Sequence, residues 1–448
     1  MESNHGALRT LTLRKSRSPR SKPWAAALTV LVFALASCGG DGAATTTAAA
    51  ADVTAPAEGD GPIPLTVWFA RDYIPEDQFQ SLEQEHNLDI TFDVRPGDNM
   101  RPTMLQMREA GEKLPDLIED DNYAIPAYIQ NDLLLPLTDL IAQFEEEDPE
   151  LYAQLLPAVW EHGTFDGEIY QMANIANFDL IYYNVPWFEE AGVELPFENW
   201  EDILEAARLL DATRPEGHPW LTTNDSFDPL YHHMVNWGVP LEGAVPDLTS
   251  EQGIALIDWY QTMREEELIT PDALAWGQDE SRGVFVAGEG GMIEAGLNAA
   301  VDFIETPGFD FGEDWAATPI PAQPGGGLMA VPRGWSIVSE TEHPYEASLV
   351  LRYLAAPEQA QSRLFAGSQT PLNTVVMDSP EVAEYFPHMT EDIKEKFVGE
   401  TVALPAAANI GEVGPILIEL RLELIEGTDA SPEEVAEKYQ AMLEEASS

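Results

Sequence analysis

A short apolar strand, a helix and a second apolar strand follow one another early in the chain, and this order constrains the fold more than any other feature. Leu65–Phe69 is typical of a buried strand, Glu76–Glu85 of a helix, and Leu88–Val94 of a strand with alternating apolar residues. Two strands joined through a helix at this spacing are expected to be parallel, with the helix crossing over the sheet. The sequence therefore predicts an α/β fold.

The alternation of helices and strands continues along the chain, and most later helices begin at a Pro or Ser start signal. We expect helices over Met104–Ala110, Ala124–Asn131, Trp200–Leu210, Ser250–Glu266, Pro344–Ala355, Pro357–Phe365, Pro380–Tyr385 and Pro432–Glu445, and strands over Leu117–Glu119, Glu168–Tyr170 and Leu180–Tyr183. With 448 residues, the chain exceeds what one hydrophobic core usually supports, so two domains are expected. No repeat of fixed period is present, which argues against a solenoid or propeller.

The N-terminal segment has the pattern of an export signal. Six basic residues precede the apolar run Trp24–Ala36, which has 13 residues and is shorter than the roughly 20 that a spanning helix needs. The segment Leu35–Gly39 resembles the lipobox of bacterial lipoproteins, which implies a diacylglyceryl group on Cys38. We expect a signal peptide over residues 1–37, a flexible tether over 38–62, and an extracytoplasmic protein that is lipid-anchored to the cell membrane.

The balance of charge excludes some partners. Against 79 acidic residues the chain has 22 Lys and Arg, a formal charge of −57, so nonspecific nucleic-acid binding is excluded. The acidic composition has two equally good explanations. It suits a protein that works in high salt, where repulsion between carboxylates is screened, and it is also expected if the proteins of the host are generally acidic. The single cysteine permits no intrachain disulfide, cysteine metal cluster or CxxC redox pair.

Several segments, taken in order and spacing, carry the pattern of one family. They are Lys113–Ile118, Asp132–Leu137, Gly167–Tyr170 with Leu180–Asn184, Trp187–Val193 with Asn199–Ile203, Phe285–Met292, Gly334–Ser339 with His343–Ala347, and Gly367–Leu372. Together they resemble the extracellular solute-binding proteins of ABC importers, in particular the sugar-binding family that includes the maltose-binding protein. The sequence departs from the family pattern at Asp132, where Gly is common, and at Gly291, where Ala is usual.

The resemblance implies a periplasmic-binding-protein type II fold, with two α/β lobes joined by crossing hinge segments. Lobe 1 would comprise 63–173 plus 325–368, and lobe 2 would comprise 177–318 plus 372–445. A ligand that contacts both lobes favours the closed state, which the membrane permease then recognises. The resemblance further implies a monomer without enzymatic activity or cofactor, and permease and ATPase partners.

A sugar presents hydroxyls at its edge and apolar C–H faces, so its site needs aromatic plates together with Asp, Asn, Glu and Arg. The family pattern and the carboxyl ends of the expected strands give the candidate ligand-binding residues Arg71, Asp72, Tyr73, Asp121, Asn122, Asn177, Phe178, Asn224, Asp225, Trp237, Glu294, Asn298, Arg333 and Trp335. Asp121, Asn177 and Trp335 are the first choices. By the family pattern, Glu294, Asn298, Arg333 and Trp335 are expected in later loops.

The neighbouring His232 and His233 suggest a metal, but adjacent helical residues point about 100° apart and no cysteine accompanies them. We therefore expect no metal site and no catalytic residue.

Two other classes of protein remain open. A secreted carbohydrate-active hydrolase would use paired carboxylates, and a scaffold or adhesin lipoprotein would have no small ligand. The sequence contains no Gly-x-Ser-x-Gly elbow, His-Glu-x-x-His helix or phosphate-binding Gly-x-x-x-x-Gly-Lys loop. The sequence leaves open whether the ligand is a monosaccharide, an oligosaccharide, a polyol, a glycerol phosphate or another solute.

Overall fold

The first predicted strand, helix and strand form one edge of a sheet. Strands β1 (Ile63–Phe69) and β2 (Leu88–Val94) pair in parallel, with Ile63 opposite Leu88, and α1 (Gln80–His86) joins them. On its other side β1 pairs in parallel with β3 (Leu117–Asp121). The predicted parallel sheet with a crossover helix is therefore confirmed.

The computed structural model describes residues 61–70, 78–95, 97–222, 228–367, 370–403 and 409–447, which all belong to one folded unit, Ala51–Ser448. The predicted signal peptide, Cys38 and most of the tether lie outside the described residues, and so do the following site candidates: Arg71, Asp72, Tyr73, Asn224 and Asp225. Within the described ranges, no helix combines the length and apolar character that crossing a bilayer requires.

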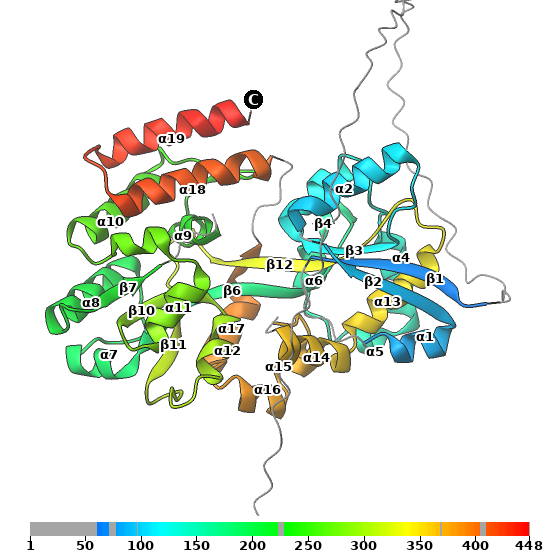
Figure 1. Cartoon of the computed structure of the whole chain (residues 1–448), viewed down its shortest axis with the longest axis horizontal. Helices are drawn as coiled ribbons and strands as arrows, with labels where there is room; N and C mark the ends of the chain where they lie inside the picture. The colour runs from blue at the N-terminus through cyan, green and yellow to red at the C-terminus, as the bar shows by residue number, and fades with distance from the viewer. Residues whose placement is uncertain are drawn as a thin grey trace, which may run out of the picture. The chain divides into compact units, whose positions relative to one another are not determined.

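Two long strands connect the halves of the main sheet. The strand order is β2-β1-β3-β12-β6-β10-β7, where β10 is Gly290–Gly296 and β7 is His218–Leu221. In addition, β11 (Trp315–Pro319) pairs with β6, and β13 (Thr401–Ala403) pairs with β12. Strand β12 (Leu328–Ile337) is antiparallel to both β3 and β6 (Met172–Asn184). In Figure 1, β6 and β12 run side by side between the strands β1, β2 and β3 and the strands β7, β10 and β11.

A third segment follows the same course beside β6. Pro371 forms an antiparallel bridge with Ile175, and the N–H of Ala176 donates to the carbonyl of Thr370 over 3.0 Å. The Leu372 N–H donates to the Asn174 carbonyl, also over 3.0 Å. Three chain segments therefore lie side by side at the middle of the sheet. The lobe limits expected from the sequence stay a prediction.

The remaining elements complete both halves. The other strands are β4 (Thr164–Phe165), β5 (Glu168–Ile169), β7 (His218–Leu221), β8 (Leu241–Glu242), β9 (Val245–Pro246), β10 (Gly290–Gly296), β11 (Trp315–Pro319) and β13 (Thr401–Ala403). The other helices are α2 (Gly97–Ala110), α3 (Ile125–Ile129), α4 (Thr138–Glu147), α5 (Pro149–Tyr152), α6 (Ala158–Glu161), α7 (Val185–Ala191), α8 (Trp200–Thr213), α9 (Asp228–Trp237), α10 (Glu251–Glu265), α11 (Gln278–Val286), α12 (Ala299–Ile304), α13 (Pro344–Ala355), α14 (Pro357–Gly367), α15 (Thr374–Met377), α16 (Pro380–Tyr385), α17 (Glu391–Glu400), α18 (Ile410–Glu426) and α19 (Pro432–Ala446), with 3₁₀ turns η1 (Asn122–Ala124) and η2 (Pro271–Ala275).

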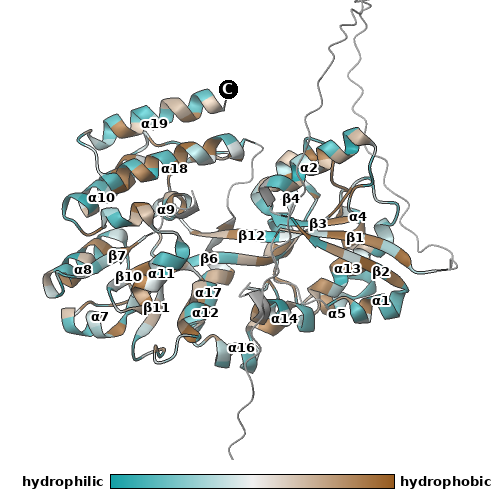
Figure 2. Cartoon of the chain, in the orientation of Figure 1, coloured by the Kyte–Doolittle hydropathy of each residue, from teal (hydrophilic) through white to brown (hydrophobic). Residues whose placement is uncertain are grey.

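The burial pattern of β6 shows to which face of the sheet each of its side chains points. Phe178, Leu180 and Tyr182 pack into one hydrophobic cluster, whereas Ile181 packs into another that is built largely from α8, α9, α10, α18 and α19. These helices are amphipathic, and Figure 2 shows brown and teal residues alternating on α10 and α19. Alternate residues of a strand point to opposite faces, so the odd-numbered residues of this part of β6 face α9.

Candidate functional site

The candidate site lies where β6 exchanges one set of neighbours for another. From Met172 to Phe178 the strand pairs with β12, and from Asp179 onward it pairs with β10, joined from Leu180 by β11. Open α/β sheets bind ligands where the strand order switches. Asn177 and Asp179 stand on either side of this switch and share the face of β6 that is turned toward α9.

The neighbouring strand β12 extends this face toward β3. Val331 stands opposite Asn177, and Arg333 follows two residues later on the same face. Arg333 therefore lies within β12 and not in the expected loop. Arg333 in turn stands opposite Asp121, the last residue of β3. The guanidinium of Arg333 donates to Asp121 Oδ1 through Nε at 2.8 Å and Nη2 at 2.6 Å. Tyr123 OH donates to Asp121 Oδ2 at 3.2 Å.

On the other side, β10 extends the same face. Gly296 stands opposite Asp179, and Glu294 precedes Gly296 by two residues, within β10 rather than in the expected loop. The register thus aligns charged and amide side chains across four strands. We call this set the polar row; it consists of Asp121, Arg333, Asn177, Asp179 and Glu294.

The absence of a side chain at Gly296 makes room for two amides of the site. A Cβ at this position would lie 2.3 Å from Asn177 Nδ2 and 2.8 Å from Asn298 Oδ1. Asn177 Oδ1 is buried and has no hydrogen-bond partner among the described residues. The two candidate asparagines are therefore brought together, with one amide oxygen available to a donor.

Two histidines of α9 reach two carboxylates of the polar row. His232 Nδ1 lies 2.8 Å from Asp179 Oδ2, and His233 Nε2 contacts Glu294 Oε2. Tyr260 OH on α10 lies 2.8 Å from His233 Nδ1. The four side chains of the two histidine–carboxylate pairs are largely shielded from solvent. Sequence patterns did not indicate Asp179 or Tyr260 as site residues, nor that His232 would contact a carboxylate of β6, because these contacts join segments far apart in the chain.

A further carboxylate lies beneath the Asp121 end of the polar row. Asp120 is buried, accepts a hydrogen bond from Tyr128 OH at 2.8 Å, and accepts another from the N–H of Asp121. Burial, and then the charge of Asp121, raises the pKa of Asp120 from 3.8 to about 7, against the hydrogen bond from Tyr128 and the charge of Arg333. The neighbouring Asn122 is buried, and its Oδ1 has no partner among the described residues.

The aromatic candidates are placed differently from the expectation. Trp335 belongs to β12 rather than to a loop and is 0 % exposed, with its ring edge against Phe69 at a centroid distance of 4.9 Å. Phe178 is also 0 % exposed and stacks on Phe397. Both rings are covered by the core, so neither face is open to a ligand, and we remove both from the candidate set.

Among the aromatic candidates in the part of the chain that the structure describes, Trp237 keeps some exposure. It ends α9, and its ring lies 5.9 Å from that of Trp200, tilted by 36°. Its Nε1 is buried without a hydrogen-bond partner among the described residues. One part of Trp237 therefore packs in the core while the rest remains accessible.

Helix α9 is also tied to the segment that leads into β12. The side-chain amide of Asn236 donates to the Gly327 carbonyl at 2.8 Å, and the Gln323 N–H donates to the Asn236 carbonyl at 2.7 Å. A Cβ on Gly326 would lie 2.2 Å from that same carbonyl oxygen. Helix α9, which carries the two histidines, is thus hydrogen-bonded to the segment just before β12, one of the strands of the polar row.

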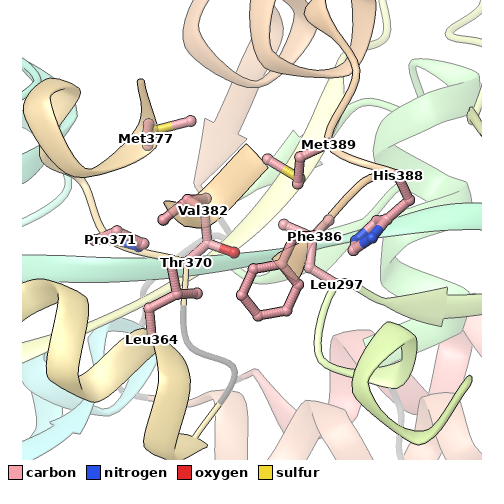
Figure 3. A pocket seen from close by; sticks show the side chains of 9 residues that line it. All are labelled: Leu297, Leu364, Thr370, Pro371, Met377, Val382, Phe386, His388 and Met389. Carbon is pink, nitrogen blue, oxygen red and sulfur yellow. The ribbon is translucent and has the colours of Figure 1, made fainter. Parts of the chain in front are cut away.

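A separate apolar pocket lies beside the segment that pairs with β6 and is shown in Figure 3. Its lining residues are Leu297, Leu364, Thr370, Pro371, Met377, Val382, Phe386, His388 and Met389. His388 is 1 % exposed, and neither ring nitrogen has a partner among the described residues. Burial lowers the pKa of His388 to about 3, so the ring is neutral at physiological pH. One hydroxyl and one neutral imidazole offer little to a polyhydroxylated ligand, so the polar row is the better candidate site.

Comparison with known proteins identifies the family of the chain. Residues 67–361, more than half of the chain, match the model of the bacterial extracellular solute-binding protein family. The chain belongs to this family. The arabinooligosaccharide-binding protein of Halalkalibacterium halodurans is 23% identical over 331 residues, which cover 68% of this chain and 70% of that protein.

Solved structures of solute-binding proteins share the fold. The GacH receptor of Streptomyces glaucescens, solved unliganded and with acarbose, has a TM-score of 0.66 and 18% identity, covering 86% of this chain and 98% of that one. An ABC transporter solute-binding protein from Agrobacterium radiobacter K84, solved with ribitol, has a TM-score of 0.68 and 16% identity, covering 86% and 99%. These likenesses confirm the predicted type II fold of this family member.

Proposed function

We propose that this solute-binding protein captures a carbohydrate or polyol at the polar row and delivers it to the permease of an ABC importer without altering it chemically. The observation that carries the proposal is the polar row itself, at the point where β6 leaves one half of the sheet for the other. The relatives support the solute class, since one is named for arabino-oligosaccharides and the similar structures hold acarbose and ribitol.

The chemistry of the row suits a ligand with many hydroxyls. Asn177 and Asn298 offer amide donors and acceptors, and the Asp121–Arg333 pair offers both signs of charge at one place. Trp237 supplies the partly accessible ring for an apolar sugar face. Asn122 and Glu294 stay in the proposed set, and Arg71, Asp72, Tyr73, Asn224 and Asp225 stay in it on the sequence pattern alone.

The topology supports a closing motion on ligand binding. A solute held by residues from both ends of the row contacts β3 and β12 on one side and β10 on the other, so it favours the conformation in which these groups approach. We propose that the permease binds this closed conformation. We further propose that the protein acts as a monomer and that its two lobes follow the limits expected from the sequence.

A lipid on Cys38 would keep the receptor at the membrane beside its permease. A single acyl chain binds membranes only marginally, whereas two or more hold firmly, so a diacylglyceryl group supplies the anchor. Substituting Cys38→Ser should release the protein into the medium of the producing cell, as measured by immunoblotting of membrane and medium fractions. Retention of the variant in the membrane would contradict lipidation.

The binding role is tested by a thermal-shift screen of the soluble chain against sugars, polyols and sugar phosphates. A true ligand raises the melting temperature progressively with its concentration. Asn177→Ala should weaken binding of that ligand, whereas Asp258→Asn on the exposed face of α10 should leave it unchanged. Chromatography of the ligand after long incubation should recover it intact; conversion to product would favour a hydrolase instead.

A further inference from the structure

We propose that Asp179, His232 and Glu294 form a binding site for one divalent transition-metal ion. One potential ligand atom from each of the three side chains lies within 4.8 Å of those of the other two. The inference does not depend on the solute, since the three residues are already assembled by the fold. Nothing in the family membership or in the relatives' names assigns a metal to these positions.

The fold brings the three ligands from three elements. Asp179 and Glu294 project from the paired strands β6 and β10, and His232 projects from α9, which packs over that face. The Asp179 Oδ2 and His232 Nδ1 atoms are 2.8 Å apart. Two ligands of one zinc ion at about 2.1 Å from the metal are separated by about 3.4 Å in a tetrahedral site, so a small outward movement of this pair admits an ion.

One of the three proposed ligands has a buried oxygen without a hydrogen-bond partner among the described residues. Glu294 is 8 % exposed, and its Oε1 is buried with no hydrogen-bond partner among the described residues. A buried carboxylate oxygen without a donor costs free energy that a bound cation would recover. Together with Asp179, the two carboxylates supply the negative charge that a divalent ion requires.

The other carboxylate oxygen of Glu294 contacts a histidine that is itself hydrogen-bonded. His233 Nε2 contacts Glu294 Oε2, and Tyr260 OH lies 2.8 Å from His233 Nδ1. Metal-binding carboxylates and histidines are commonly oriented by such outer partners. His233 is therefore a positioning residue, and the Tyr260–His233 pair fixes the Glu294 carboxylate with Oε1 left for the ion.

The ligand set selects the class of metal. One imidazole and two carboxylates suit Zn²⁺ and neighbouring first-row ions, whereas Ca²⁺ and Mg²⁺ prefer oxygen ligands alone. The acidic chain, with a formal charge of −57, attracts every cation weakly. Selectivity for Zn²⁺ and Co²⁺ at high ionic strength, where exposed charges are screened, therefore separates the site from this general attraction.

The test uses the mature chain with Cys38→Ser, because a free thiol is itself a zinc ligand. After chelator treatment, calorimetric titration with Zn²⁺ at high ionic strength should give one equivalent of bound metal, and Co²⁺ should give a visible absorption band. Each of Asp179→Asn, His232→Gln and Glu294→Gln should weaken Zn²⁺ binding by more than about tenfold and remove the band. His233→Gln should weaken binding by about tenfold, as an outer partner does.

The matched control is His86→Gln, which removes an exposed histidine at the end of α1 and should bind Zn²⁺ like the parent. Circular dichroism checks that each variant is folded. The proposal fails if the parent retains no Zn²⁺, if His232→Gln and Glu294→Gln bind it as tightly as the parent, or if Ca²⁺ binds equally well. Because no sugar is present, these failures leave the proposed solute binding untouched, and a failed sugar screen leaves the metal result untouched.

Discussion

Arg363 on α14 and Glu119 on β3 form an ion pair in which neither side chain has any exposed surface. The Arg363 guanidinium also lies 5.4 Å from the centre of the Trp335 ring. With the Asn174 amide oriented to accept, its oxygen lies 2.6 Å from Arg363 Nη1 and 3.3 Å from Trp335 Nε1. One arginine thus ties together β3, β6, β12 and α14 beneath the middle of the sheet.

Breaking the Arg363–Glu119 ion pair should destabilise the fold. Glu119→Gln leaves the guanidinium buried without its counter-charge, so we expect the free energy of unfolding to fall by about 3–5 kcal/mol. Urea denaturation monitored by circular dichroism measures the loss. The control is Glu266→Gln, which breaks the more exposed pair with Arg208 and should change stability by about 1 kcal/mol or less. Equal effects of the two substitutions would contradict the buried network.

The surroundings of Trp335 lead to a prediction about stability. Trp335→Ala should lower the free energy of unfolding by about 3–5 kcal/mol, because it opens a cavity beside Phe69 and Arg363. Trp237→Ala removes a partly accessible ring. Compared with Trp335→Ala, it should lower the free energy of unfolding less and weaken solute binding more. Denaturation curves measure the stability of both variants, and ligand titrations measure their solute affinity. A Trp335→Ala variant of normal stability and reduced affinity would return this residue to the ligand site.

Sequence patterns predicted the elements that carry strong local signals. Helices Pro344–Ala355 and Pro380–Tyr385 match α13 and α16 residue for residue, because a proline marks each start. Helix α2 begins at Gly97 rather than at Met104, since Pro102 inside it resembles a stop signal. Strand β6 is far longer than the predicted Leu180–Tyr183, because its first half is rich in Ala and Asn and is stabilised by pairing with the distant β12.

The site was harder to predict than the fold. Strand ends and family pattern pointed to Asp121, Asn177 and Glu294, which do lie in one row. Asp179 gave no signal, and its contact with His232 could not be predicted, because the contact joins positions 53 residues apart through the packing of α9 on β6. Helix geometry and the lack of a cysteine partner predict no metal at the histidine pair. The structure instead gives each histidine its own carboxylate.

The raised pKa of Asp120 predicts a pH dependence of stability. Between about pH 4 and about pH 7 the native Asp120 retains a proton that the unfolded chain releases, so this residue's contribution to the free energy of unfolding falls as pH rises through that window. A shift of this size corresponds to at most about 4 kcal/mol. Asp120→Asn removes the dependence.

Urea denaturation of the parent and of Asp120→Asn at about pH 4 and about pH 8 tests this sign. The variant should gain stability relative to the parent as pH rises, while Asp258→Asn on the exposed face of α10 should follow the parent at both values. Parallel behaviour of Asp120→Asn and the parent would show that Asp120 titrates normally.

Gly296→Ala tests whether the two asparagines form part of the solute site. The new Cβ would stand 2.3 Å from Asn177 Nδ2 and 2.8 Å from Asn298 Oδ1, so at least one amide must move. If those amides hold the solute, its affinity should fall by about tenfold, equivalent to roughly 1.4 kcal/mol. Gly283→Ala on α11 is the matched control, because no described atom beyond the chain neighbours and the backbone of its own helix lies within 4 Å of the added methyl. Alanine there should stabilise the helix by about 0.5–1 kcal/mol without affecting binding. Isothermal titration of both variants with a ligand from the screen gives the comparison. Unchanged affinity in Gly296→Ala, with a normal melting temperature, would place the solute elsewhere on the polar row.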